Sequence, residues 1–127
     1  MNGKKIAIMQ PYFLPYIGYF QLINAVDEFI IYDDVNYIKQ GFINRNYILS
    51  QGLKVFLTLE TFGASSNKKI NEVLIGNNKE KILKTIEVNY RKAPYFKNVF
   101  NLILEIMNFE ENNLSRFVGN SLFKIVE

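Results

Sequence analysis

The sequence predicts an α/β fold, in which a small Rossmann-like parallel sheet of three or four strands is followed by a helical C-terminal half. Two apolar runs, residues 6–9 and 28–34, flank a segment with helical spacing, and this order is that of a βαβ unit. From residue 77 onward the apolar residues recur only at helical spacing. Because 127 residues suffice for one domain with a core of its own, we expect a single α/β domain over residues 1–127.

The first predicted strand, Ile6 to Met9, has the length and composition of a strand that is buried on both faces. Pro11 and Pro15 follow it. Each proline lacks a backbone donor and favours extended geometry in the residue before it, so we expect a stiff loop after the strand. A helix over residues 16–27 comes next, and Pro15 suits its first turn.

The later elements are predicted from turn residues and from the spacing of apolar residues. Residues 35–48 should form a loop with short extended or helical pieces, because Asn and Gly interrupt the pattern. Gln51-Gly52 is a turn before a third strand at residues 54–60, and residues 70–75 form a short fourth strand. Residues 62–69 lack the spacing of a phosphate-binding loop and are interpreted as a flexible linker. Three helices complete the chain, starting at Asn77 or Asn78, at Tyr95, and at Asn112 or Asn113.

The composition excludes several kinds of chemistry. The chain has no cysteine and no histidine, so disulfides, thiolate nucleophiles and Ser-His or Cys-His pairs are absent from it. A usual zinc site cannot be built either, and we assign no residue as a metal ligand. A hard cation such as Mg²⁺, held by carboxylates, is the metal that the composition allows.

The charge pattern favours small anionic substrates over nucleic acids. The formal net charge is only +3 and the basic residues are spread along the chain, so we expect no nucleic-acid partner. No signal peptide opens the sequence and no apolar run is long enough to span a membrane, which leads us to expect a cytoplasmic location. Helical spacing continues to Glu127 without a stop signal, so we expect this to be the N-terminal part of a longer chain. The oligomeric state is not indicated.

The ends of the first two predicted strands supply the first candidate site residues. Because βαβ units are right-handed and parallel, Gln10, Asp33 and Asp34 should lie at one edge of the sheet, where α/β folds bind ligands. The Gln10 amide can bind a sugar hydroxyl or a base edge, and the alternative is a simple sheet-end turn that includes Pro11. The two aspartates can act as a general base, bind Mg²⁺ or accept from a hydroxyl; alternatively they only end the strand in solvent.

Aromatic residues and one glycine follow in the loop and the first helix. Tyr12, Tyr16 and Tyr19 are candidates to stack on a sugar or a base, and an aromatic cluster in the core explains them almost as well. Gly18 allows close approach to the helix N-terminus, whose free amides and dipole favour phosphate.

Cationic and amide side chains gather between residues 39 and 46. Lys39 and Arg45 offer positive charge for a phosphate or for an acyl oxyanion, against a role in surface solubility. Arg45 stands between Asn44 and Asn46, and this trio is predicted to clamp a carboxylate or a phosphate.

The same stretch resembles a known family. The run IMQPYFLPYIGYFQLI, followed by DEFIIYDDVNYIKQGFINRNYI, resembles the N-terminal signature of the WbqC-like proteins, most densely over residues 5–60. These proteins are found in bacterial gene clusters for O-antigen and other surface polysaccharides. The resemblance implies a transferase that moves an aminoacyl or acyl group, such as glycine, onto an amino sugar.

A weaker resemblance links residues 13–19 to nucleotidyltransferases of the HxGH class. Those proteins open with a strand, a Pro/Phe-containing loop and a His-x-Gly-His at the start of the first helix. Tyr16 and Tyr19 stand where the two histidines would be. This likeness therefore supports a nucleotide-type fold more than an adenylyl-transfer reaction.

Together these observations predict a transferase of surface-polysaccharide synthesis that binds a nucleotide-linked sugar. On this interpretation Asp33 or Asp34 deprotonates the attacking amine, and Lys39 and Arg45 hold phosphates or the developing oxyanion. Two alternatives stay open: a nucleotidyltransferase-like protein that binds a nucleotide with Mg²⁺, and a noncatalytic binding module.

Overall fold

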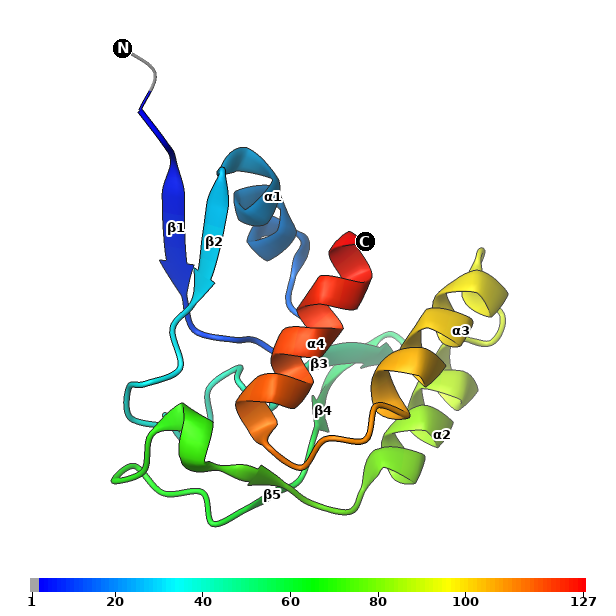
Figure 1. Cartoon of the computed structure of the whole chain (residues 1–127). Helices are drawn as coiled ribbons and strands as arrows, with labels where there is room; N and C mark the ends of the chain where they lie inside the picture. Colours follow the sequence, from blue (N-terminus) through cyan, green and yellow to red (C-terminus); the bar gives the residue numbers. More distant parts are fainter. Residues whose placement is uncertain (1–2) are drawn as a thin grey trace.

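The computed structural model describes residues 3–127 and has a mixed α/β architecture (Figure 1). The elements in chain order are β1 (Ile6–Met9), α1 (Ile17–Ala25), β2 (Glu28–Ile31), β3 (Arg45–Ser50), β4 (Leu53–Thr58), β5 (Thr61–Phe62), the 3-10 helix η1 (Ile70–Glu72), β6 (Leu74–Ile75), α2 (Lys79–Tyr90), α3 (Phe96–Met107) and α4 (Leu114–Val126).

The predicted βαβ unit is present. Strands β1 and β2 pair in parallel, with Ile8 opposite Ile30, and α1 connects them. The pairing continues past the strand ends, where the Tyr32 N–H donates to the Met9 carbonyl at 2.7 Å. The carboxyl ends of the two strands therefore meet at one edge, as the sequence predicts.

The prediction of three or four parallel strands is not confirmed, because the parallel sheet has two strands. The expected third strand, β4, pairs instead with β3 in an antiparallel hairpin. Gln51 and Gly52, the two residues between them, have φ angles of 51° and 78°. Two consecutive positive φ values are the geometry of a tight hairpin turn, so the chain folds β4 back on its nearest neighbour. Strands β5 and β6 form the third pair, which is short and antiparallel.

The expectation that the first strand is buried on both faces is wrong. Ala7 is buried, whereas Ile6 and Ile8 are more than half exposed. Without a third strand or a second layer of helices, one face of the two-stranded sheet stays open to solvent.

The helical C-terminal half forms largely as predicted. Asn113 caps α4, because its side-chain oxygen accepts from the Arg116 N–H at 3.0 Å. Asn78 has a different task at the start of α2. Its amide accepts from the Glu60 N–H and donates to the Thr58 carbonyl, so it ties α2 to the end of β4.

The main core lies between the β3–β4 hairpin, η1 and the three later helices. Its buried members are Phe13, Tyr37, Ile43, Leu57, Leu59, Ile70, Val73, Ile75, Ile82, Ile86, Ile106, Met107, Leu114, Phe117 and Val118. The βαβ unit lies to one side of this core and α4 lies between the two (Figure 1). Gly119 on α4 permits that approach, since a Cβ there would lie 3.2 Å from Cδ1 of Ile31.

Candidate functional site

The predicted edge brings Gln10 close to the chain segment that carries the aspartates. The Gln10 carbonyl accepts from the Tyr19 hydroxyl at 2.7 Å, which fixes the start of the loop against α1. Five hollows stand out on the described part of the chain, and none of them is lined by Gln10, Asp33 or Asp34. The edge therefore exists, but the hollows lie elsewhere.

Asp33 is held in place by two later parts of the chain. Its carboxylate accepts from the Ser115 hydroxyl in the first turn of α4 at 2.5 Å, and its carbonyl accepts from the Asn71 N–H at 3.0 Å. A carboxylate at this end of a helix also interacts favourably with the helix dipole. Asp34, in contrast, is exposed.

Of the three candidate tyrosines, two belong to an aromatic cluster and one is exposed to solvent. Tyr19 is buried, and burial raises the pKa of its hydroxyl well above the usual range. Its ring lies 5.5 Å from that of Tyr12, which in turn lies 6.0 Å from that of Phe42. Tyr16 is exposed and covers Gly18, where a Cβ would lie only 2.3 Å from the Tyr16 ring.

Loop residues next to these tyrosines are held by contacts with other parts of the protein. Pro11 is buried, and the Asn46 amide donates to the carbonyls of Phe13 and Leu14. Leu14 has a φ of 44°, an unfavourable value for leucine, so these bonds help to hold a strained loop on β3.

Three predicted site residues meet in a polar hollow of about 440 Å³, which we call the cationic hollow. It contains Lys39, Asn44 and Arg45 from the prediction. The full lining is Tyr37, Lys39, Gln40, Asn44, Arg45, Thr58, Thr61, Gly63 and Ala64. The lining has two cations and several hydroxyl and amide groups, and no carboxylate.

Arg45 is fixed before any ligand arrives. Its Nε donates to the Gly41 carbonyl at 3.1 Å and its Nη2 donates to the Gln40 carbonyl. The guanidinium carbon also lies 3.8 Å from the centre of the Phe56 ring. Because these three partners are neutral, the positive charge is oriented but not cancelled.

Tyr37 and Asn44 build the floor of the cationic hollow. The Tyr37 hydroxyl donates to the Asn44 side-chain oxygen at 2.8 Å, and the Asn44 amide donates to the Leu59 carbonyl at 2.9 Å. Burial raises the pKa of Tyr37, and nearby Arg45 opposes that rise. The hydroxyl therefore stays protonated and supports Asn44 rigidly.

A third cation lies at the margin of the cationic hollow. A Cβ on Gly63 would be 3.1 Å from the Lys68 Nζ, so this ammonium lies beside the lining. Lys39, Arg45 and Lys68 take part in none of the ion pairs found among residues 3–127.

The comparisons with known proteins agree with the resemblance seen in the sequence. The sequence model of the WbqC-like protein family matches residues 10–127. The chain belongs to this family. Every residue of the cationic hollow falls within the matched range.

One curated relative was found for this WbqC-like chain, an uncharacterized protein of Mycobacterium tuberculosis. It is 40% identical over 116 residues, which cover 88% of the chain and 50% of the relative. The chain thus spans about half the length of the relative that it matches. No solved structure matches the chain.

Sequence reasoning missed several parts of this WbqC-like site. Tyr37, Thr58, Thr61, Gly63 and Lys68 were not predicted to belong to it. Two pairings bring these residues to the site: β3 with β4, which places Thr58 opposite Arg45, and residues 33–37 with residues 68–71, where the Tyr37 N–H donates to the Lys68 carbonyl at 2.8 Å. The usable signal was the small, basic composition of residues 62–69, which was interpreted as a linker.

The described residues of this family member show no group of three or more acidic side chains arranged to hold a metal ion. None of their helices is both long and apolar enough to cross a bilayer. The chemistry that the cationic hollow offers is the binding of an anion next to hydroxyl and amide groups.

Proposed function

We propose that this protein takes part in surface-polysaccharide (O-antigen) biosynthesis as a transferase that moves an aminoacyl or acyl group onto a nucleotide-linked amino sugar. In this proposal the cationic hollow holds the phosphates of the sugar nucleotide. Membership in the WbqC-like family supports the biological setting.

The observation that supports the proposal most directly is a hollow whose positively charged side chains have no carboxylate in the same lining. Lys39 and Arg45 line it, Lys68 lies at its margin, and its lining has no carboxylate to compete with a ligand. A diphosphate gains charge-assisted hydrogen bonds from such a cluster, and an Arg held in advance loses little side-chain freedom on binding. The hydroxyls of Thr58 and Thr61 suit the sugar or the ribose.

Asp34 is the better candidate for the general base. Asp33 has its carboxylate occupied by Ser115, whereas Asp34 is exposed. Asp34 lies three residues before Tyr37 of the hollow floor, and three extended residues span at most about 11 Å. A sugar amine carried by a nucleotide in the hollow can therefore reach this carboxylate.

Calorimetric titration with UDP-glucosamine, with and without Mg²⁺, tests the proposal. We expect the intact protein to bind, and Lys39→Ala to weaken binding about tenfold, because a charge-assisted bond contributes roughly 1.5 kcal/mol or more. Arg45→Ala should weaken it further. Lys84→Ala, an exposed lysine on α2, is the matched control and should change nothing. Absence of binding, or equal loss in the control, would contradict the proposal.

The group-transfer step needs its own assay. Mass spectrometry of UDP-glucosamine incubated with an activated glycine donor should show glycine added by the wild type, and by Asp34→Asn far more slowly. Binding of ATP or CTP with Mg²⁺ in place of UDP-glucosamine would favour a nucleotidyltransferase-like protein instead.

A further inference from the structure

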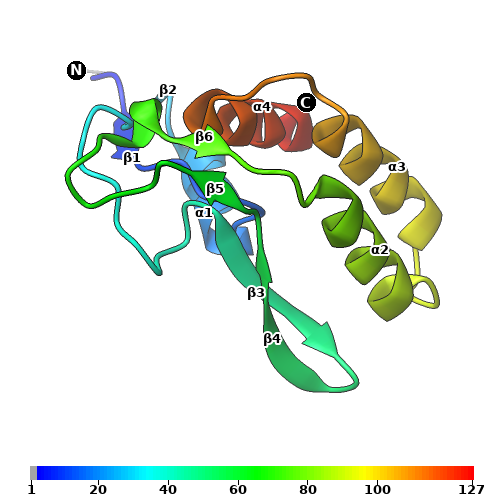
Figure 2. The ribbon, with the colours of Figure 1, turned by 90° about the horizontal axis from the view of Figure 1, so that it is seen from below.

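Residues in or near the turn of the β3–β4 hairpin and the α2–α3 loop expose large apolar side chains. Their exposed fractions are 58% for Leu49, 69% for Leu53, 81% for Tyr95 and 51% for Val99. Figure 2 shows that the hairpin turn and the α2–α3 loop both point away from the β1–β2 sheet. We call these four residues the apolar tip.

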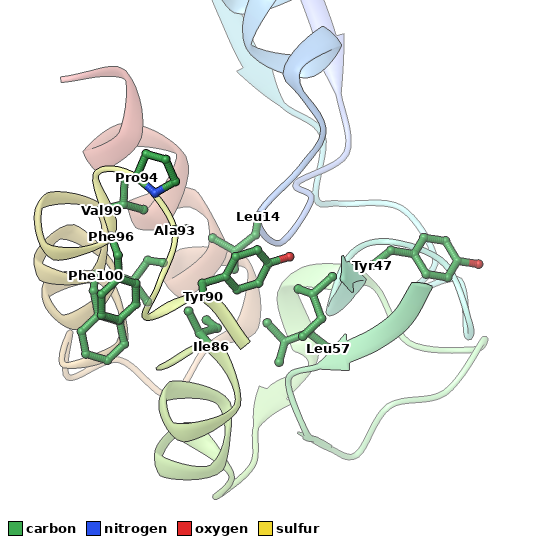
Figure 3. A pocket seen from close by; sticks show the side chains of 12 residues that line it. Leu14, Tyr47, Leu57, Ile86, Tyr90, Ala93, Pro94, Phe96, Val99 and Phe100 are labelled. Carbon is green, nitrogen blue, oxygen red and sulfur yellow. The ribbon is translucent and has the colours of Figure 1, made fainter. Parts of the chain in front are cut away.

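An apolar groove of about 380 Å³ joins the two parts of the apolar tip (Figure 3). Its lining includes Ile48 and Leu57 from the hairpin, Pro94 from the α2–α3 loop, and Phe96 and Phe100 from α3. Across the groove the Leu49 N–H donates to the Tyr90 hydroxyl at 2.8 Å, so the hairpin and α2 keep a fixed spacing. Val99 lines the groove, and Leu53 shares the groove face of the hairpin with Ile48 and Leu57, whereas Leu49 lies on the other face.

The charged residues nearest the apolar tip along the chain are basic. Residues 49–59 and residues 88–104 contain no Asp or Glu. They carry Lys54, Arg91, Lys92 and Lys97, and none of these takes part in an ion pair among the described residues. Apolar side chains whose nearest charged neighbours along the chain are cations match the composition of protein surfaces that bind anionic bilayers.

Tyr95 supports the same partner. It has a φ of 64°, a left-handed conformation that costs a non-glycine residue energy, and this conformation leaves its ring in solvent. Tyrosine is favoured at the boundary between lipid and water, because its ring is apolar and its hydroxyl is polar.

We propose that the apolar tip docks the protein peripherally on an anionic lipid bilayer. Leu53 and Tyr95 enter the interface, the groove accepts part of an acyl chain, and Lys54, Arg91, Lys92 and Lys97 contact lipid phosphates. A second copy fits less well, because two such surfaces facing each other bring like charges together. This proposal goes beyond the proposed transfer reaction and does not depend on it.

Co-sedimentation with vesicles tests the docking surface. The protein should sediment with vesicles of equimolar phosphatidylcholine and phosphatidylglycerol, should not sediment with phosphatidylcholine alone, and should be released by high salt. Lys92→Glu should weaken binding at least fivefold, since one basic residue near an anionic surface contributes about 1 kcal/mol. The double variant Leu53→Ser/Tyr95→Ser should weaken it at least tenfold.

Two control variants place the same changes on the β1–β2 side of the molecule. Ile8→Ser alters an exposed apolar residue and Lys5→Glu reverses an exposed charge, and both should bind like the wild type. Circular dichroism of all variants checks that they fold. The proposal is overturned if the wild type ignores anionic vesicles, if the tip variants bind like the wild type, or if the controls lose as much. A dimer that only the tip variants abolish, without vesicle binding, would assign the surface to a second copy.

Discussion

At the residue scale, the polar side chains of the cationic hollow support its structure as well as its chemistry. Arg45 closes the turn at residues 40–41 and Asn44 joins Tyr37 to Leu59, yet both also line the hollow. No buried side-chain nitrogen or oxygen in the described part of the chain lacks a partner. The site is therefore organised in advance, which reduces the entropy lost on binding.

Tyr37 and Tyr19 give the protein a defined response to alkaline pH. The pKa of each is raised in the folded state above the ordinary value of 10.0. The unfolded chain therefore loses these protons first, so the free energy of unfolding is constant with respect to them below pH 10 and falls as the pH rises above it. Thermal unfolding between pH 8 and pH 11 measures this fall.

The variant Tyr37→Phe separates one of these contributions. It should make the fall above pH 10 shallower, and it should cost about 1–3 kcal/mol at pH 7 because Asn44 loses a buried donor. Tyr32→Phe, at an exposed position, is the control and should do neither. An unchanged slope in Tyr37→Phe would show that this hydroxyl does not contribute.

Ser115→Ala tests whether Asp33 acts as an anchor. The variant removes the donor to the half-buried Asp33 carboxylate and should lower the free energy of unfolding by about 1–3 kcal/mol. Urea denaturation measures it, with the exposed Ser66→Ala as the reference. If Ser115→Ala leaves stability unchanged but abolishes transfer, Asp33 belongs to the chemistry instead.

At the scale of elements, the hairpin turn determines which strand β4 pairs with. A substitution in this turn should also stabilise the protein. Gln51 has a left-handed φ of 51°, which asparagine tolerates better than glutamine. Gln51→Asn should therefore raise the free energy of unfolding by up to about 1 kcal/mol. Gly52→Ala, at a φ of 78°, should lower it, and the opposite signs of the two changes in urea denaturation are the diagnostic result.

The helices could be predicted more closely than the sheets. The α3 helix was expected to start at Tyr95 and spans Phe96–Met107, because its apolar stripe has an unambiguous period. The apolar run of β4 fits a parallel sheet and a hairpin equally well, and only the turn geometry at Gln51-Gly52 selects between them. Local pattern reveals that a strand exists, but not which strand it pairs with.

In the candidate site, too, the residues that are close in sequence could be predicted and those from distant segments could not. Lys39, Asn44 and Arg45 are close in sequence, and the structure brings them together. Thr61 and Gly63 follow β4, whose pairing with β3 places Thr58 opposite Arg45, whereas Lys68 reaches the site through the pairing of residues 68–71 with residues 33–37. Nothing in the local sequence encodes that pairing.

At the scale of the whole molecule, the fold places two distinct surfaces on the two sides of the β3–β4 hairpin. The cationic hollow is lined by Arg45 and Thr58 from one face of the hairpin, and the apolar groove is lined by Ile48 and Leu57 from the other face, toward α2 and α3 (Figure 3). The βαβ unit that dominates the sequence signature packs beside α4, outside the main core. We propose that it positions Asp34 near the hollow rather than forming the phosphate site itself.

The most direct test of this account is to map the binding of a nucleotide by the amide chemical shifts of ¹⁵N-labelled protein. Titration with UDP should shift the amides of residues 37–45 and 58–64 and leave those of α3 unchanged. The same titration on Arg45→Ala should produce little shift. Shifts centred on residues 10–19 instead, or no shifts at any accessible concentration, would contradict the claim that the cationic hollow is the phosphate site.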